Sequence, residues 1–322
     1  MNRSTLHARS CSIYYCAGLS ACLMLMVCLC AFITPLHAAG AKQKSFKSPE
    51  GAVDAMIAAL KENDQKALTA IFGPHNEDLI SSGDDVDDRT HRELFIKLSV
   101  EKKTLAKVGD HKALLYVGGE EWPFPIPIVK QGASWRFNTK AGREEIIDRR
   151  VGRNELGAIQ TCLAYVDAQR EYALMDLDRD GLFEYAERFM SEPGKKDGLY
   201  WETKEGEKPS PLGALVAAAR EEGYSTKASA NEPVPYHGYY YRILTAQGKN
   251  AASGAHNYIV DGRMIGGFAL VAYPARYGSS GIMTFVVNHN GVVFQKNLGK
   301  KTSQAARAMK TFDPDRTWGN VE

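Results

Sequence analysis

One twelve-residue stretch, residues 176–187, restricts the folds open to this chain. Carboxylates stand at its first, third, fifth, ninth and twelfth places, a glycine at its sixth and an apolar residue at its eighth. This is the pattern of an EF-hand-like calcium loop, in which hard oxygen ligands surround one cation and the glycine permits a sharp turn. Such a loop joins two helices, so the sequence predicts a helix–loop–helix here.

The expected ligands of this loop are carboxylates and one backbone carbonyl. They are Asp176, Asp178, Asp180, the carbonyl of Leu182, Glu184 directly or through a water, and Glu187. So many carboxylates at one point repel each other without a cation. The alternative is an Asp-rich helix cap and turn that leaves most of the acids in water. The pattern has no second copy, so we expect a structural Ca²⁺ rather than a sensor that opens on binding.

Residues 1–39 have the character of a secretory signal peptide. Arg3 and Arg9 precede an apolar run, and small residues follow it, with cleavage expected after Ala38 or Ala39. A permanent membrane anchor is the alternative, but the run is shorter than the roughly 20 residues that span a bilayer. We therefore expect a periplasmic or secreted protein with no transmembrane segment after signal cleavage.

Cysteine usage and charge exclude several classes of protein. Five of the six cysteines lie in the predicted signal peptide, so Cys162 alone remains and no disulfide can form within the chain. Cys162 flanks an apolar helical stripe, which favours a small core residue over a nucleophile. The formal charge of +2 comes from Arg3 and Arg9. Residues 40–322 are therefore neutral and have no electrostatic case for nucleic acid or anionic lipid.

Residues 40–146 are predicted to form an N-terminal α+β part. Ser48 caps a first amphipathic helix, a second follows it and ends at Gly73, and this pair resembles the opening of cone-shaped nuclear-transport-factor-like domains. The polar residues 81–89 predict a surface loop. In residues 122–129, apolar side chains alternate with three prolines, so one side of the strand lacks N–H donors and it pairs on one side only.

Residues 147–201 are predicted to form a helical connector around the acidic loop. The arginines among acids in residues 143–153 indicate a solvated helix face. Asn154 is expected to cap a longer helix that leads into the loop, and residues 185–190 resume a helical pattern.

Residues 202–322 are predicted to be β-rich. A helix after Pro211 precedes several short strands, two of them joined at Asp261-Gly262 and two at Asn290-Gly291, which favour two-residue hairpin turns. A short helix over residues 302–310 follows. The fold class is therefore α+β: an N-terminal helix pair with a small antiparallel sheet, a central helix–loop–helix, and a C-terminal antiparallel sheet with flanking helices.

No catalytic constellation accompanies these elements. The sequence has no zinc-binding histidine pair on a helix, no nucleophile elbow and no phosphate-binding glycine loop. His237 and His256 lie in a tyrosine-rich β region, where with Tyr239 and Tyr241 they form a candidate ligand-binding group. The absence of a catalytic motif favours a non-enzymatic protein without excluding an enzyme.

Long strings across the chain resemble one family of exported bacterial proteins, labelled domain of unknown function 2950. The strings are WPFPIP at 122–127, AGREEI at 141–146, RRVGRNEL at 149–156, YVDAQREY at 165–172, PGKKDGLYW at 193–201, GGFALVAYP at 266–274 and FDPD at 312–315. The resemblance implies export from a bacterium and one full-length unit. It implies no activity, substrate or catalytic residue.

Three functions remain open. The first is a non-enzymatic binding or envelope-assembly factor, with a structural Ca²⁺ and an envelope or extracellular partner. The second is an envelope-polymer hydrolase whose site lies between the two sheets and uses His237, His256 or paired acids. The third is a small-molecule carrier whose cavity, in the N-terminal part, is lined by Trp122 and Phe124.

Overall fold

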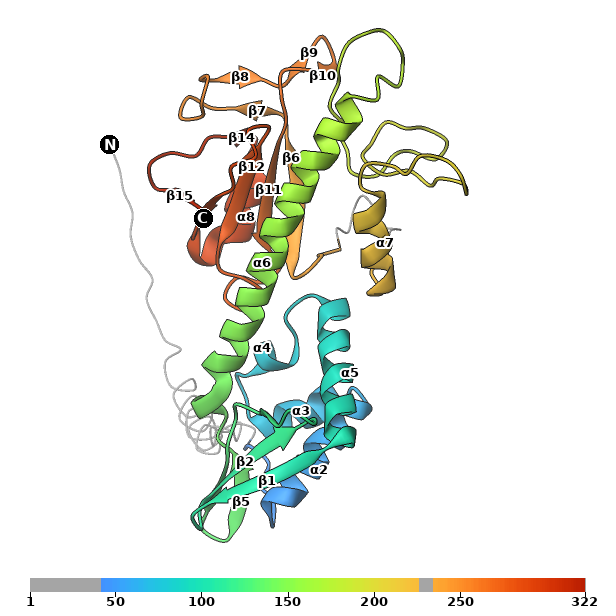
Figure 1. The fold of residues 1–322 in the computed structure, drawn as a ribbon. Coiled ribbons are helices and arrows are strands. Elements are labelled where there is room, and N and C mark those ends of the chain that lie inside the picture. Colours follow the sequence, from blue (N-terminus) through green and yellow to red (C-terminus); the bar gives the residue numbers. More distant parts are fainter. Residues whose placement is uncertain (1–41, 226–233, 322) are drawn as a thin grey trace, which may run out of the picture. The chain divides into compact units, whose positions relative to one another are not determined.

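Two apolar cores organise this chain, one in its N-terminal part and one in its C-terminal part. The computed structural model describes residues 42–225 and 234–321, so the predicted signal peptide lies outside the described residues. Helices and antiparallel sheets make up both parts, which confirms the α+β prediction (Figure 1). One helix, α6 (Thr139–Ala173), contributes side chains to both cores.

The N-terminal helices begin where the sequence offers caps. They are α2 (Pro49–Lys61), α3 (Gln65–Phe72), α4 (Glu77–Ile80) and α5 (Asp85–Glu101). The Ser48 hydroxyl accepts the N–H of Gly51 at 3.1 Å, and Pro49 takes the first helical position, as predicted. The apolar stripe of α2, including Val53 and Met56, is buried.

The prediction of a surface loop at residues 81–89 is wrong, because α5 begins at Asp85. The Asp84 carboxylate accepts the N–H groups of Val86 and Asp87, and further acids occupy the first turn. Acids at this end favour a helix because they face its positive dipole. A run of polar residues can thus begin a helix as well as form a loop.

The N-terminal sheet shows how the proline segment pairs. Its strands are β1 (Lys103–Val108), β2 (Lys112–Val117), β3 (Trp122–Pro123), β4 (Ile128–Gln131) and β5 (Ser134–Phe137), in the order β1-β2-β4-β5, with β3 also on β2. Residues 122–124 bond to β2 alone, as predicted, and the chain pairs on both sides after the last proline. Ile126 and Ile128 are buried, whereas Trp122 is 59% exposed.

Helix α6 runs unbroken through the predicted boundary at residue 147. Its 35 residues span about 52 Å at 1.5 Å per residue. Asn154 is not a cap: it lies inside the helix, buried, and its Nδ2 donates to the Ser280 carbonyl at 2.9 Å. The arginines of residues 143–153 are not all solvated either, because Arg150 is buried.

The helix predicted at residues 185–190 is absent, so the acidic loop lacks the second helix of an EF-hand at that point. The backbone there is irregular, and the Tyr185 N–H donates to the Met264 carbonyl at 2.8 Å. The next helix is α7 (Gly213–Glu221). The Tyr185 ring packs against Phe268, 4.8 Å between centroids, so tertiary contacts outweigh a weak local helical pattern.

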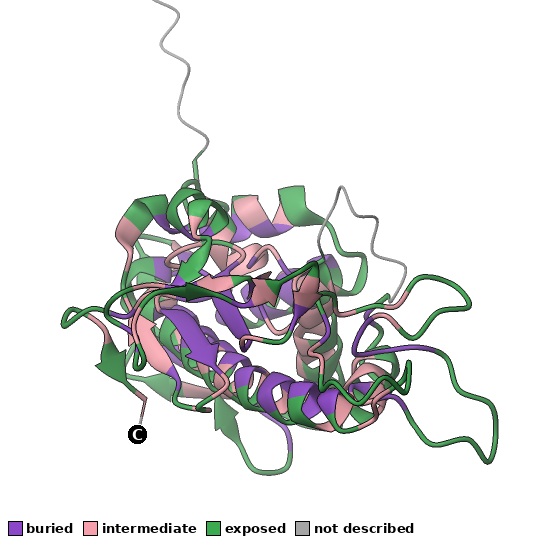
Figure 2. Ribbon diagram, turned by 90° about the horizontal axis from the view of Figure 1, so that it is seen from above, coloured by how far each residue is buried: buried purple, intermediate pink, exposed green. Residues whose placement is uncertain are grey.

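The C-terminal part is built on an antiparallel sheet in the order β15-β13-β12-β11-β6. Its strands are β6 (Tyr239–Leu244), β11 (Ala269–Pro274), β12 (Thr284–Asn288), β13 (Phe294–Lys296) and β15 (Gly319–Asn320). A smaller sheet contains β7 (Ala246–Gln247), β8 (His256–Asn257) and β14 (Thr311–Phe312). The short helices are η2 (Gly299–Lys301) and α8 (Thr302–Ala308). In Figure 2 the buried residues gather on the inner strands.

The two predicted hairpin turns differ in outcome. Asp261 and Gly262 both have positive φ and join β9 (Ile259–Val260) to β10 (Arg263–Met264) as a two-residue turn, as predicted. At the second site Gly291 has positive φ but Asn290 does not, and residues 289–293 form a longer connection from β12 to β13.

None of the helices in residues 42–225 and 234–321 combines the length and apolar character that a bilayer crossing requires.

Candidate binding site

A cavity of about 260 Å³ opens in the N-terminal part. Its walls are mainly apolar side chains from three helices and the proline segment: Met56, Leu60, Leu68, Phe72, Phe95 and Phe124. Such a volume holds about nine groups the size of a water molecule. The cavity is therefore large enough for a small apolar molecule, although its volume lies just below the usual range for ligand pockets, about 300–1,000 Å³.

The proline segment and α6 meet closely beside this cavity. A Cβ added to Gly142 would lie 2.3 Å from the Pro125 carbonyl oxygen, so glycine is needed for this approach. Alternation along the segment aims Phe124 and Ile126 at the cavity, and α6 adds Ile146. Phe124 was predicted to line such a cavity and does, whereas Trp122 is not among its lining residues.

Charged side chains surround the apolar walls of the cavity. Helix α5 supplies Asp87, Asp88, His91 and Arg92, and α6 supplies Arg149, Arg150 and Arg153. We call these seven residues the charged rim. An apolar interior with a few charged groups around it suits a molecule with one polar end.

Asp87 and His91 form an ion pair one helical turn apart in the charged rim. His91 Nδ1 lies 3.1 Å from Asp87 Oδ1. The hydrogen bond with the Asp87 carboxylate raises the pKa of His91 above its usual 6.5. Burial works to raise the pKa of Asp87, but its bond to His91 and the nearby arginines outweigh burial and lower it below 3.8. The pair therefore stabilises the charged form of each group.

Arg150 ties the cavity wall to the C-terminal part. Its Nη1 donates to the Asp78 carbonyl at 2.6 Å and to Ser279 Oγ at 3.3 Å, and its Nη2 donates to the Leu79 carbonyl at 3.1 Å. Burial lowers the pKa of Arg150 below its usual value. These bonds hold α4 against α6.

Asp84 makes the second link between the cavity and the C-terminal part. It is 1% exposed, and besides capping α5 its Oδ2 accepts the Tyr224 hydroxyl at 3.0 Å and the Gly238 N–H at 2.8 Å. Burial raises the pKa of Asp84 above 3.8, although these hydrogen bonds oppose the rise. The helix that carries four of the seven charged-rim residues thus begins on a buried carboxylate that also binds the C-terminal part.

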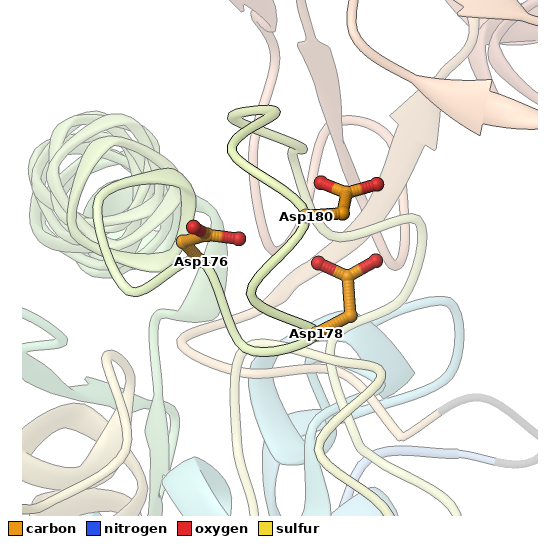
Figure 3. A group of neighbouring side chains, drawn as sticks. All are labelled: Asp176, Asp178 and Asp180. Carbon is orange, nitrogen blue, oxygen red and sulfur yellow. The ribbon is translucent and has the colours of Figure 1, made fainter.

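The acidic loop brings three of its predicted ligands together. Carboxylate oxygens of Asp176, Asp178 and Asp180 lie within 4.8 Å of one another (Figure 3). Gly181 has positive φ, as a sharp turn requires. Glu184 and the exposed Glu187 are not members of this group.

Arg263 already neutralises much of this acidic loop. Its guanidinium forms ion pairs with Asp178 at 3.2 Å, with Asp180 at 2.5 Å and with Glu184. The guanidinium charge relieves the repulsion among the carboxylates that the sequence alone assigned to a cation. Asp176 Oδ1 is buried and has no hydrogen-bond partner among the described residues.

The structure does not bring His237 and His256 together. His237 precedes β6, packs against the Tyr236 ring with 4.1 Å between centroids, and lies 3.6 Å from the Glu222 carboxylate. His256 pairs with Gln247 beyond the other end of β6. At about 3.3 Å per strand residue, they are separated by roughly 20 Å or more. The candidate ligand-binding group is therefore not assembled.

The two tyrosines of that group and Cys162 have structural roles. Tyr239 is buried and donates to the Met283 carbonyl at 3.0 Å, and Tyr241 donates to the Tyr236 carbonyl at 3.3 Å. Cys162 is fully buried in the C-terminal core, and burial raises the pKa of its thiol to about 12. Such a thiol is a poor nucleophile, which agrees with the predicted core role.

The comparisons with known proteins give a family and no activity. The model of the family described as "Protein of unknown function (DUF2950)" matches residues 43–321. The chain belongs to the DUF2950 family. No curated protein and no solved structure matches this chain. The resemblance found in the sequence is thereby confirmed, and the function of this DUF2950 protein has to be argued from its own residues.

Sequence reasoning missed the charged rim of this DUF2950 protein. Asp87 and Asp88 were assigned to a surface loop, and Arg150 and Arg153 to a solvated helix face. The available signal was Asp84 followed by acids and by Leu94, Phe95 and Leu98 at helical spacing, which together predict α5.

Proposed function

We propose that this protein is an exported binding protein that holds a small, largely apolar molecule in its N-terminal cavity. The observation that carries the proposal is the cavity of about 260 Å³ with apolar walls and a charged rim. Export is inferred from residues 1–39, which favour a periplasmic or secreted location. An envelope or extracellular partner that supplies or receives the bound molecule belongs to the same proposal.

The binding proposal is tested by closing the cavity. Leu60→Trp places a larger side chain in its wall, so binding of medium-chain alkyl compounds, measured by calorimetry, should weaken at least about tenfold. Leu174→Trp, on an exposed leucine outside the cavity, is the matched control and should leave binding unchanged. Equal binding by the Leu60→Trp variant and wild type would refute the proposal.

A structural Ca²⁺ at the acidic loop remains a second proposal. Its support is the convergence of Asp176, Asp178 and Asp180, with one Asp176 oxygen lacking a partner among the described residues. Arg263 competes for the same carboxylates, so Ca²⁺ binding requires its guanidinium to move aside. The carbonyl of Leu182, Glu184 and Glu187 would complete the ligands.

Because Arg263 competes with Ca²⁺ for the carboxylates of the acidic loop, removing its side chain tests the calcium proposal. Arg263→Ala should increase Ca²⁺ affinity, and millimolar Ca²⁺ should raise its melting temperature more than that of wild type, because binding to the folded state stabilises it. Asp178→Ala in the same background should abolish the increase. If Ca²⁺ changes the melting temperature of neither the wild type nor the Arg263→Ala variant, the loop is a turn held by Arg263.

Hydrolysis is the alternative function, and one observation favours a modified form of it. His91 and Asp87 form a histidine–carboxylate pair in the charged rim, and such a histidine can activate water as a general base. The earlier form, an envelope-polymer hydrolase using His237 and His256, lacks an assembled site. Turnover of small esters that His91→Gln abolishes while ligand binding persists would favour hydrolysis over binding alone.

A further inference from the structure

The charged rim contains two arginines whose guanidinium groups form no hydrogen bond or ion pair with the described residues. Arg150 donates to two carbonyls and a hydroxyl, and Arg149 Nε pairs with Glu145 at 2.6 Å. Arg92 and Arg153, by contrast, form no hydrogen bond or ion pair with any residue in 42–225 and 234–321. They come from different helices, α5 and α6, and both line the cavity.

The acids of the charged rim offset only part of its positive charge, and the Asp87 carboxylate interacts electrostatically with Arg153 and Arg150. Asp87 pairs with His91, and Asp88 Oδ2 accepts the Ser82 N–H at 2.8 Å. With four arginines against two aspartates, the formal charge of the rim is positive even with His91 neutral. Cations gathered at the mouth of an apolar cavity repel one another, and a bound anion would relieve this repulsion.

We infer that the ligand is a short amphiphile with a single anionic head group, held by Arg92 and Arg153, and an apolar tail inside the cavity. This inference rests on the proposed binding function and adds the chemical class of the ligand. The cavity volume corresponds to a tail of about eight or nine carbons, at roughly the volume of one water molecule each. A guanidinium binds either a carboxylate or a phosphate head group, because its paired N–H groups donate to two oxygens at once.

The test compares four probes that share an eight-carbon tail: octanoate, octyl phosphate, octanol and octyltrimethylammonium. Calorimetry on the full chain at low salt should show one or both anions binding at least about tenfold more tightly than octanol, and the cation binding most weakly. Preference between octanoate and octyl phosphate identifies the head group. The advantage of the anion should shrink in about 1 M salt, because salt screens the exposed guanidinium groups.

Substitutions then assign the head group to its residues. Arg153→Ala and Arg92→Ala should each weaken anion binding about tenfold and leave octanol binding unchanged, since the tail contacts persist. Arg307→Ala removes an exposed arginine from α8, outside the cavity, and is the matched control with no effect. Melting temperatures check that each variant is folded.

Two outcomes would overturn the inference, and they differ in what they say of the proposed function. If octanol binds as tightly as the anions and Leu60→Trp weakens all of them, the cavity binds apolar molecules but selects no anionic head. If no probe binds at all, the proposed function fails together with the inference.

Discussion

Individual side chains in this protein take their roles from neighbours distant in sequence. Asp84 was assigned to a surface loop, yet it is buried and holds Tyr224 and Gly238. Arg263, on a short hairpin, is what neutralises the acidic loop. Both roles follow from burial and ion pairing, which local residue patterns do not encode.

The Asp87–His91 pair leads to a prediction about pH. The pKa of His91 is raised, so protonated His91 contributes stability that is fully present below about pH 6.5 and is lost as pH rises through its folded-state pKa. His91→Gln should therefore cost up to about 1 kcal/mol near pH 5, a small value because the pair is partly solvated, and almost nothing near pH 9. Urea unfolding of both proteins across this range measures the difference.

His111→Gln is the control for the pH prediction, because His111 is exposed and its side chain makes no hydrogen bond or ion pair with the described residues. The His111→Gln variant should show no pH-dependent loss of stability. If the loss of stability in His91→Gln stays constant from pH 5 to 9, His91 contributes packing rather than charge.

At the scale of elements, α6 carries the most information. It contributes to both cores, and along its length closely packed positions alternate with open ones. Its glycines illustrate the contrast: Gly142 touches the Pro125 backbone, and Gly152 has no atom within 4 Å of where its Cβ would lie. The sequence alone does not distinguish these two glycines, because both lie inside a helix.

Substituting these two glycines should therefore have opposite effects. Gly152→Ala should stabilise the protein by about 0.5–1 kcal/mol, because alanine favours the helix and nothing blocks its methyl group. Gly142→Ala should destabilise it by at least about 1–3 kcal/mol, because the methyl group would push α6 off the proline segment. Urea denaturation curves measure both, and a change of the same sign in the two variants would contradict the described packing.

For residues 42–321 as a whole, buried polar contacts connect the N-terminal and C-terminal cores. Asp84 reaches Tyr224 and Gly238, and Arg150 reaches Ser279, in addition to the shared helix α6. Because these groups are buried, breaking either link leaves donors or acceptors without partners. We therefore expect the two cores to unfold in one transition.

Asp84→Ala tests this coupling. Loss of the α5 cap and of two buried hydrogen bonds should cost about 3 kcal/mol. It should also separate the unfolding of the two cores, followed by Trp135 in the N-terminal core and by Trp318, which packs against the C-terminal core. Asp85→Ala, exposed in the first turn of α5, should cost less than about 1 kcal/mol. Equal costs for the two alanines would show that Asp84 links nothing.

Local chemistry alone determined several features of this protein. Ser48 caps α2, Asp261-Gly262 makes a two-residue turn, and the prolines restrict their segment to one-sided pairing, because each effect needs only a few neighbouring residues. The α+β class and the family could be read from the same patterns.

Only the tertiary structure decided the site. The charged rim joins His91 to Arg153 across more than sixty residues of sequence, and the walls of the cavity depend on how α6 crosses the proline segment. The acidic loop has the full spacing of a calcium loop, but no helix follows it at residues 185–190, and Arg263 of β10 forms an ion pair with Asp180. Packing and ion pairing between distant segments set these outcomes, and their free energies exceed local preferences.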